Sequence, residues 1–142
     1  MKLMTRSGAM TTLALVLSLL AGACGPSGGS ATAVAPADLT VALAGLCRAA
    51  DFARSGDLFE ARRTFLNRSH AFLHELAARG DEQTRPAVAR LLEAKQRVEA
   101  ALGTERRATP AEVAVLLEDL EVATRELAGA LGTPAPRCGG GG

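Results

Sequence analysis

The sequence predicts an all-α protein: an antiparallel, up-down-up-down four-helix bundle that follows a signal peptide and a flexible spacer. Three observations support this fold class. Apolar residues recur every three or four positions over residues 37–132, and glycine and proline divide that stretch into four segments. No stretch alternates apolar and polar residues as a strand does. Because the connections are short, successive helices are expected to be antiparallel neighbours.

The first helix is predicted over residues 38–54. Its apolar residues are spaced four and three apart, which keeps one stripe of side chains facing the core. The Ser55-Gly56 pair ends the helix, because glycine and serine favour turns over helix interiors. The predicted inward stripe consists of Leu39, Leu43, Leu46, Ala50 and Ala53.

The second helix is predicted to begin at Asp57 and to end near Arg79-Gly80. Glu60 stands three residues after Asp57, as in a capping box, where two side chains satisfy free backbone amides at the helix start. Glycine at the other end tolerates the left-handed conformation of a helix cap. On a helical wheel the inward face consists of Leu58, Ala61, Phe65, Phe72 and Leu76.

The third helix is predicted to begin at Thr84 or Arg85 and to end at Leu102-Gly103. Pro86 falls in its first turn, where the missing backbone N–H of proline costs nothing. The predicted apolar face consists of Val88, Leu91, Leu92, Val98 and Leu102.

The fourth helix is predicted to open with the capping box of Thr109 and Glu112, with Pro110 at its first position. Gly132 ends it and Pro134 prevents its resumption. The inward face consists of Val113, Leu117, Leu120, Thr124, Leu127 and Leu131. A pair of helical hairpins that forms a homodimer is the alternative arrangement, and it would leave a long apolar seam on each monomer.

The first 25 residues have the pattern of an export signal. Lys2 and Arg6 give a positive start, residues 8–23 carry no charge, and small residues precede Cys24. This order resembles the lipobox signal peptide of bacterial lipoproteins. The uncharged stretch is too short for a typical spanning helix, which needs about 20 apolar residues. An uncleaved anchor and a plain secreted protein are the alternatives.

The resemblance implies cleavage after residue 23 and a covalent lipid on Cys24. It implies an exported protein that is held at a membrane by this lipid. In a Gram-negative cell the place would be the periplasmic face of the outer membrane, because Gly25 is not the aspartate associated with inner-membrane retention. In other bacteria it would be the outer face of the cell membrane.

Four parts of the chain follow from these patterns. Residues 1–23 are the signal peptide, and residues 24–36 are the lipidated cysteine with a flexible linker rich in Gly, Ser and Ala. Residues 37–132 are the helical domain, and residues 133–142 are a flexible tail that ends in four glycines.

Composition excludes some classes of partner. The chain has 16 basic and 15 acidic residues, and loss of Lys2 and Arg6 with the leader leaves 14 basic residues. This near balance argues against nucleic acid and against a polybasic membrane patch. The chain has no Trp and no Tyr and only four Phe, so it offers no platform for base stacking.

Cys47 and Cys138 remain as a pair once Cys24 carries lipid, and a pair in an exported protein predicts a disulfide. In the antiparallel bundle, the tail after the fourth helix starts at the end where the first helix begins, and it is long enough to reach Cys47. The alternative is a small core residue at Cys47 and a free or intermolecular thiol at Cys138.

His70 and His74 are the only histidines, and they stand four residues apart in the second helix. That spacing places two imidazoles on one side of a helix, as in half of a transition-metal or haem site. Further ligands would come from Asn67, Glu75 or an acidic residue of a neighbouring helix. The wheel places both histidines beyond the apolar face, near Arg63 and Asn67, so solvated surface histidines are the simpler interpretation.

Three charged residues fall inside predicted apolar arcs: Arg62 in the second helix, and Lys95 and Glu99 in the third. A buried charge needs a partner, so these residues mark a candidate polar pocket. The alternative is that their stems pack at the edge of the bundle while their charged ends reach water.

The sequence lacks the motifs of the common enzyme classes, including CxxC, HExxH, the Walker phosphate loop, GxSxG and the CxxCH of covalent haem. We therefore expect a non-enzymatic protein with no cofactor other than the lipid. The favoured hypothesis is a binding or structural module of the cell envelope with a protein partner. The alternative is a binder of metal, haem or another small ligand through His70 and His74 or through the bundle interior.

Overall fold

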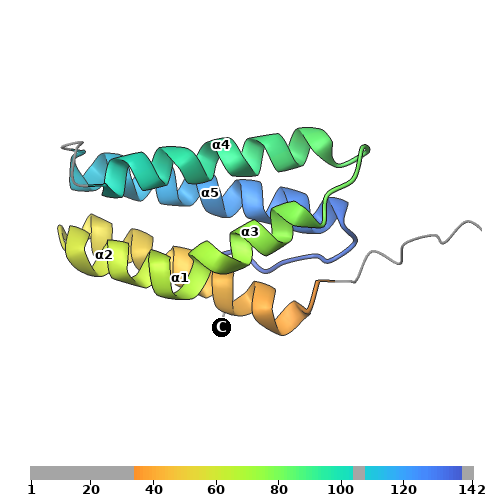
Figure 1. Cartoon of the computed structure of the whole chain (residues 1–142). Helices are drawn as coiled ribbons and strands as arrows, with labels where there is room; N and C mark the ends of the chain where they lie inside the picture. The colour runs from red at the N-terminus through yellow and green to blue at the C-terminus, as the bar shows by residue number, and fades with distance from the viewer. Residues whose placement is uncertain (1–33, 104–107, 139–142) are drawn as a thin grey trace, which may run out of the picture. The chain divides into compact units, whose positions relative to one another are not determined.

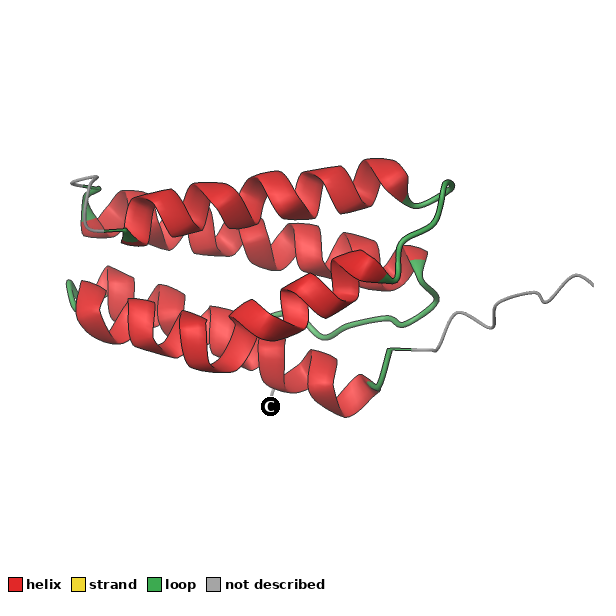
Figure 2. Cartoon of the chain, viewed as in Figure 1, coloured by secondary structure: helices red, strands yellow, loops and turns green. Residues whose placement is uncertain are grey.

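The computed structural model describes residues 34–103 and 108–138. The predicted signal peptide, the lipidated Cys24 and most of the linker lie outside the described residues, as do the last four glycines. In the described part the four predicted helices are present and no residue forms a strand (Figure 2). None of these helices is both long enough and apolar enough to cross a membrane.

The helices follow the predicted boundaries within a few residues. The second of them is continuous along the chain but consists of two α-helical parts with a π-helical turn between them. In chain order the elements are α1 (Pro36–Arg54), α2 (Leu58–Phe65), η1 (Leu66–His70), α3 (Ala71–Ala78), α4 (Arg85–Leu102) and α5 (Pro110–Ala130).

The helices lie roughly along one direction, and α5 packs against both α1 and α4 (Figure 1). The α2 helix lies beside α1, while α3 runs at an angle to α2 and contacts α1, α4 and α5. The space between them is filled mainly by leucine and alanine. The largest fully buried side chains include Phe65, Leu39, Leu46, Leu73, Leu76, Leu91, Leu117, Leu120 and Leu127.

Local sequence signals fix the helix ends as expected. Thr109 and Glu112 form the predicted capping box: the Thr109 hydroxyl accepts a bond from the Glu112 N–H, and the Glu112 carboxylate accepts one from the Thr109 N–H. At α2 the Asp57 carboxylate accepts from the Glu60 N–H at 3.0 Å, whereas the Glu60 carboxylate pairs with Arg63. The helix start at Asp57 is therefore capped by one side chain rather than by a reciprocal pair.

The π-helical turn of η1 was not predicted, and it changes the inward face of the second helix. A π turn holds one more residue than an α turn, so positions that follow it are rotated relative to those before it. Phe65 and Leu76 are buried as predicted, but Leu73 is completely buried while Phe72 is only partly buried. The prediction for Phe72 is therefore one residue out of register.

Gly45 of α1 allows η1 to approach closely. A Cβ atom at Gly45 would lie 2.5 Å from Ser69 Oγ and 2.7 Å from Arg68 Cβ, which is closer than such atoms pack. The buried Ser69 hydroxyl uses this proximity to donate a 2.8 Å hydrogen bond to the Ala42 carbonyl of α1. The pair of Gly45 and Ser69 thus fixes the spacing between α1 and η1.

The chain segments beside the helices also pack on the domain. Val34, which the sequence assigns to the linker, is 3% exposed and belongs to the core. After α5 the chain turns at Gly132, where a φ of 81° favours glycine. Thr133 is then buried and Ala135 packs against the core. The described part of the tail therefore lies against the helices.

Candidate functional site

Two histidines lie next to each other where the π-helical turn meets α3. His70 is the last residue of η1, and His74 is in the first turn of α3. Their ring centroids are 4.9 Å apart, and the His70 ring also packs edge-on against Phe65. His70 is half-buried and His74 is exposed. Solvent therefore reaches His74, while His70 is held against the core by its contact with Phe65.

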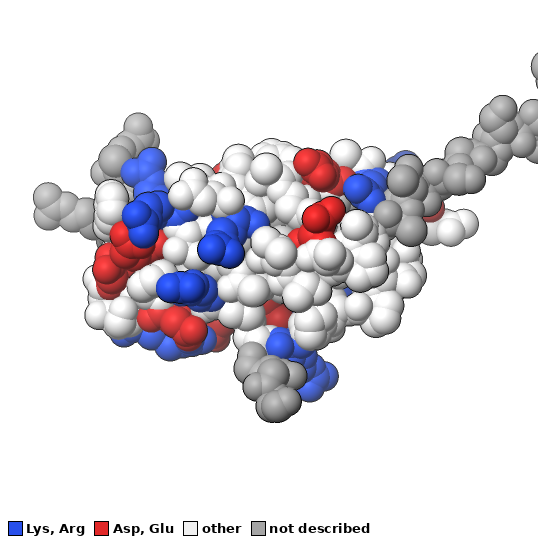
Figure 3. Space-filling view, turned by 90° about the horizontal axis from the view of Figure 1, so that it is seen from below, with Lys and Arg blue, Asp and Glu red and all other residues white. Residues whose placement is uncertain are grey.

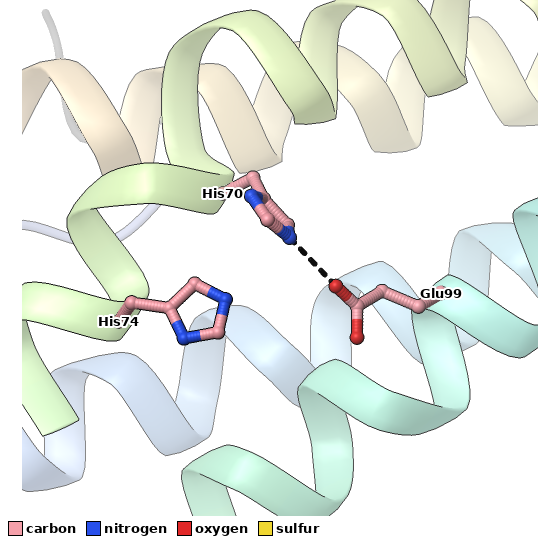
Figure 4. Close-up of side chains that lie close together, drawn as sticks. All are labelled: His70, His74 and Glu99. Carbon is pink, nitrogen blue, oxygen red and sulfur yellow. Dashed lines mark hydrogen bonds and ion pairs between the residues drawn. The ribbon is translucent and has the colours of Figure 1, made fainter.

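Glu99 of α4 completes the cluster (Figure 4). His70 Nε2 and Glu99 Oε1 are 2.7 Å apart, and this bond joins η1 to α4. The sequence offered three possible further ligands, and the one that the structure places beside His70 is an acidic residue of a neighbouring helix. The helical wheel placed the two histidines near Arg63 and Asn67. In the structure, Arg63 and Asn67 line a separate groove beside α1.

Lys95 lies one helical turn before Glu99 and anchors it. Its side chain is 5% exposed, and Lys95 Nζ donates a 2.6 Å hydrogen bond to Glu99 Oε1. The structure thus brings together two of the three residues of the candidate polar pocket. Arg62, the third member of the predicted pocket, is exposed on α2 and takes no part in the pair. The helical wheel predicted Arg62 inside the apolar arc. A helical wheel gives only the direction in which a side chain leaves the helix, and a long arginine side chain can extend from there into water.

The surroundings of Glu99 favour its charged form. Partial burial alone would raise the pKa of the carboxyl, but the hydrogen bonds and positive charge supplied by Lys95 and His70 outweigh burial. The pKa of Glu99 therefore lies below its ordinary value. A carboxylate at this position neutralises the buried ammonium group of Lys95, which would otherwise be costly to bury.

His70, His74 and Glu99 together have the composition of a metal site. One ligand atom from each lies within 4.8 Å of the others, and no other group of three potential ligands among the described residues is this close. Two imidazole nitrogens and one carboxylate oxygen suit Zn²⁺ and Cu²⁺. Lys95 and His70 both bond to Oε1 of Glu99, which leaves Oε2 unused by either of them.

Cys47 of α1 and Cys138 of the tail lie at disulfide distance, with their Cα atoms 5.6 Å apart. This is the pair that the sequence predicts. The tail after α5 folds back onto the helices and brings Cys138 to α1. The pair is separated by 91 residues in sequence, so it ties the chain after α5 to the first helix.

A further buried charge, which the sequence patterns did not single out, is Glu121 of α5. Its side chain is 8% exposed and accepts two hydrogen bonds from Arg125, at 2.7 and 3.3 Å. The signal was present, since Glu121 follows Leu117 by four residues and thus falls on the inward face of α5.

Comparison of the chain with protein-family models, with curated proteins and with solved structures found no match.

Proposed function

We propose that this chain is a lipid-anchored protein of the bacterial cell envelope that binds a divalent transition-metal ion through His70, His74 and Glu99. The observation that carries the proposal is the convergence of three metal-ligand atoms from two separate helical segments within 4.8 Å. The proposal narrows the binding module predicted from the sequence to one class of ligand. The lipobox pattern around Cys24 supports the location and the anchor.

The scaffold in this proposal is an antiparallel up-down-up-down bundle. Short connections and the packing of α1 on α2, of α4 on α5 and of α1 on α5 support that order. Such bundles hold metal ions with side chains from facing helices. Here the facing elements are η1 with α3 on one side and α4 on the other.

Each ligand has a structural reason for its position. His70 is held by the π turn and by its edge contact with Phe65, which is 1% exposed. Glu99 is held by Lys95 and stays ionised, as a metal ligand must. His74 is exposed, and one of its ring nitrogens already lies within 4.8 Å of the other two ligand atoms. A metal would take the place of the His70–Glu99 hydrogen bond and leave coordination positions open to water.

The test is a calorimetric titration of the full chain, solubilised in a neutral detergent, with Zn²⁺ and with Cu²⁺. We expect one metal ion per chain, and we expect His70→Gln, His74→Gln and Glu99→Gln each to weaken binding by about tenfold or more. Substitution with Co²⁺ adds a readout of the ligands, because its visible absorption depends on coordination geometry. The three variants are expected to change that spectrum.

Glu93→Gln is the matched control for Glu99→Gln, since Glu93 is an exposed acidic residue of the same helix. It is expected to bind metal as the unaltered chain does. Equal metal affinity in the two histidine variants and the unaltered chain would exclude the site. Titration with haem in the same assay checks the other ligand expected from the histidine spacing.

The anchor is tested separately from the metal. A Cys24→Ala chain is expected to lose the lipid and to leave the membrane fraction of cells. If this variant still partitions with membranes as the unaltered chain does, the lipoprotein part of the proposal is wrong, whatever the metal titration gives.

A further inference from the structure

A groove between α1 and the second helical segment lies apart from the histidine cluster. We call it the arginine groove, because Arg48 of α1, Arg63 of α2 and Arg68 of η1 all line it, together with Phe52, Thr64 and Asn67. Its volume is about 530 Å³. On the face of the molecule seen in Figure 3, basic side chains gather with acidic ones among them.

The positive charge of the arginine groove is only partly neutralised. Glu60 is the one acidic residue that lines it, and Glu60 pairs with Arg63 at 2.6 Å. In the part of the chain that the structure describes, neither Arg48 nor Arg68 has a carboxylate within ion-pair distance. Two guanidinium groups are thus available to an anion, although the chain as a whole has a net charge of only +1.

The groove is also built by the fold. The close approach of Gly45 to Ser69 brings η1 against α1, and Arg68 Cβ would lie 2.7 Å from a Cβ at Gly45. Arg48 follows Gly45 by three residues and therefore lies nearly one turn further along the same side of α1. Its guanidinium lies over the Phe52 ring, 5.6 Å from the centroid, which restrains the group and leaves its edges free to donate.

We propose that the arginine groove binds a phosphate group. A guanidinium donates two parallel hydrogen bonds to phosphate oxygens, and Arg48 from α1 and Arg68 from η1 line the same groove. The Thr64 hydroxyl and the Asn67 amide supply further uncharged donors in the same groove. A soluble phosphate compound and the phosphate of a lipid headgroup share this chemistry. The site is independent of the proposed metal site.

The first experiment titrates inorganic phosphate into the full chain in neutral detergent, by calorimetry at constant ionic strength. The double variant Arg48→Gln/Arg68→Gln is expected to weaken binding by about tenfold or more. The control Arg85→Gln/Arg97→Gln changes the net charge equally at exposed positions of α4, and its affinity is expected to stay within about twofold. Arg48→Lys/Arg68→Lys keeps the charge but loses the paired donors, and it is expected to weaken binding as well.

Absence of phosphate binding overturns the proposal. An equal effect of the groove variant and the α4 control also overturns it, because that result means diffuse attraction by net charge. Unchanged phosphate affinity in Arg48→Lys/Arg68→Lys also overturns the proposal, because lysine lacks the paired donors. His70→Gln is expected to bind phosphate normally, so failure of the metal site leaves this test intact. Circular dichroism and the unfolding midpoint confirm that each variant is folded.

A second experiment distinguishes the two sources of phosphate. The full chain is placed in phosphatidylcholine vesicles that contain either phosphatidylglycerol or oleate, and binding of inorganic phosphate is measured in both. A phosphate affinity that is several-fold weaker with phosphatidylglycerol than with an equal surface charge of oleate, which carries no phosphate, assigns the groove to lipid headgroups. Equal affinity in the two vesicles assigns it to a soluble phosphate compound.

Discussion

Helix α5 and the segment formed by α2, η1 and α3 have similar lengths but differ in regularity. Helix α5 is α-helical from Pro110 to Ala130, and most of its predicted inward residues are buried. The other segment is interrupted by the π-helical turn Leu66–His70. Two residues of this turn bond to other helices: Ser69 to α1 and His70 to α4.

The two regions differ in where they bond to neighbouring helices. Helix α5 forms ion pairs at exposed positions, Glu118 with Arg54 and Glu126 with Arg90, whereas η1 uses the buried Ser69 and the half-buried His70. A regular helix presents one apolar stripe, and its capping residues are at its ends. A π turn costs some regularity but redirects side chains, which is why such turns are frequent at functional sites. In this protein the turn directs Ser69 to α1 and His70 to α4, and it lies between the two candidate sites.

The largest expected effect concerns the disulfide that joins the tail after the regular helix α5 to α1. Replacing both Cys47 and Cys138 with alanine is expected to lower the free energy of unfolding by about 4–5 kcal/mol, because a cross-link over 91 residues restricts the unfolded chain. Urea denaturation of both chains measures this loss. Two titratable thiols in the unreduced, exported protein, besides Cys24, would show that the bond does not form.

The register beyond the π turn is tested by two alanine variants. Leu73→Ala is expected to lower the free energy of unfolding by about 3 kcal/mol, because Leu73 is 0% exposed. Phe72→Ala is expected to cost less, since its side chain is only partly buried. A larger loss for Phe72→Ala in the same denaturation assay would mean that the helix continues without the extra residue.

The contact between α1 and η1 is tested by adding one methyl group. Gly45→Ala is expected to lower the free energy of unfolding by about 1–3 kcal/mol, because the new Cβ meets Ser69 and Arg68. Gly129→Ala in α5 is the matched control, since its Cβ would meet no atom within 4 Å. It is expected to stabilise the helix by about 0.5–1 kcal/mol. Equal effects at the two glycines would contradict the close approach.

The N-cap of the regular helix α5 is expected to contribute less to the free energy of unfolding than the buried Leu73 of the interrupted segment. Thr109→Ala removes the side chain that accepts the Glu112 N–H, and it is expected to lower the free energy of unfolding by about 1 kcal/mol. Thr109→Ser keeps the hydroxyl and serves as the control. A loss as large as that of Leu73→Ala would show that the cap has a further role in the fold.

The smallest effect is expected in the pH dependence of stability that Glu99 gives, because solvent screens this partly exposed carboxylate. The Glu99→Gln variant has a separate, pH-independent cost, since it leaves Lys95 buried without a carboxylate. The folded pKa of Glu99 is lowered from 4.5, so its contribution to stability is present above that pH and is lost as the pH falls through the folded pKa. Glu99→Gln is expected to flatten the fall of the unfolding free energy as the pH drops below 4.5. The control Glu93→Gln is expected to keep the slope, and an unchanged slope in both variants would contradict the assignment.

The helix boundaries could be predicted from the sequence because local interactions set them. The capping residues Asp57 and Thr109, the glycine at 132 and the prolines at 86 and 110 act on neighbouring backbone groups, and such effects do not depend on the rest of the fold. The apolar spacing likewise predicts most of the core, since each residue of a regular helix has a known direction.

Part of the candidate site could be predicted in the same way. The spacing of His70 and His74 places them together on any helix, and Lys95 and Glu99 are one turn apart on theirs. Their burial and their partners could not be predicted, because these depend on which faces of two separate helices meet. Arg62 shows the limit, since its place on the wheel suggested the core and its side chain lies in water.

The π turn and its contacts depend on the tertiary structure. The sequence contains no local signal for it, and it is fixed by the packing of Ser69 against Gly45 and of Leu73 into the core. These contacts join residues far apart in the chain, so their energy appears only when the helices pack. The same packing brings Glu99 to His70 and places Arg48 and Arg68 in one groove. Helix formation is thus local in this protein, whereas both candidate sites are products of helix packing.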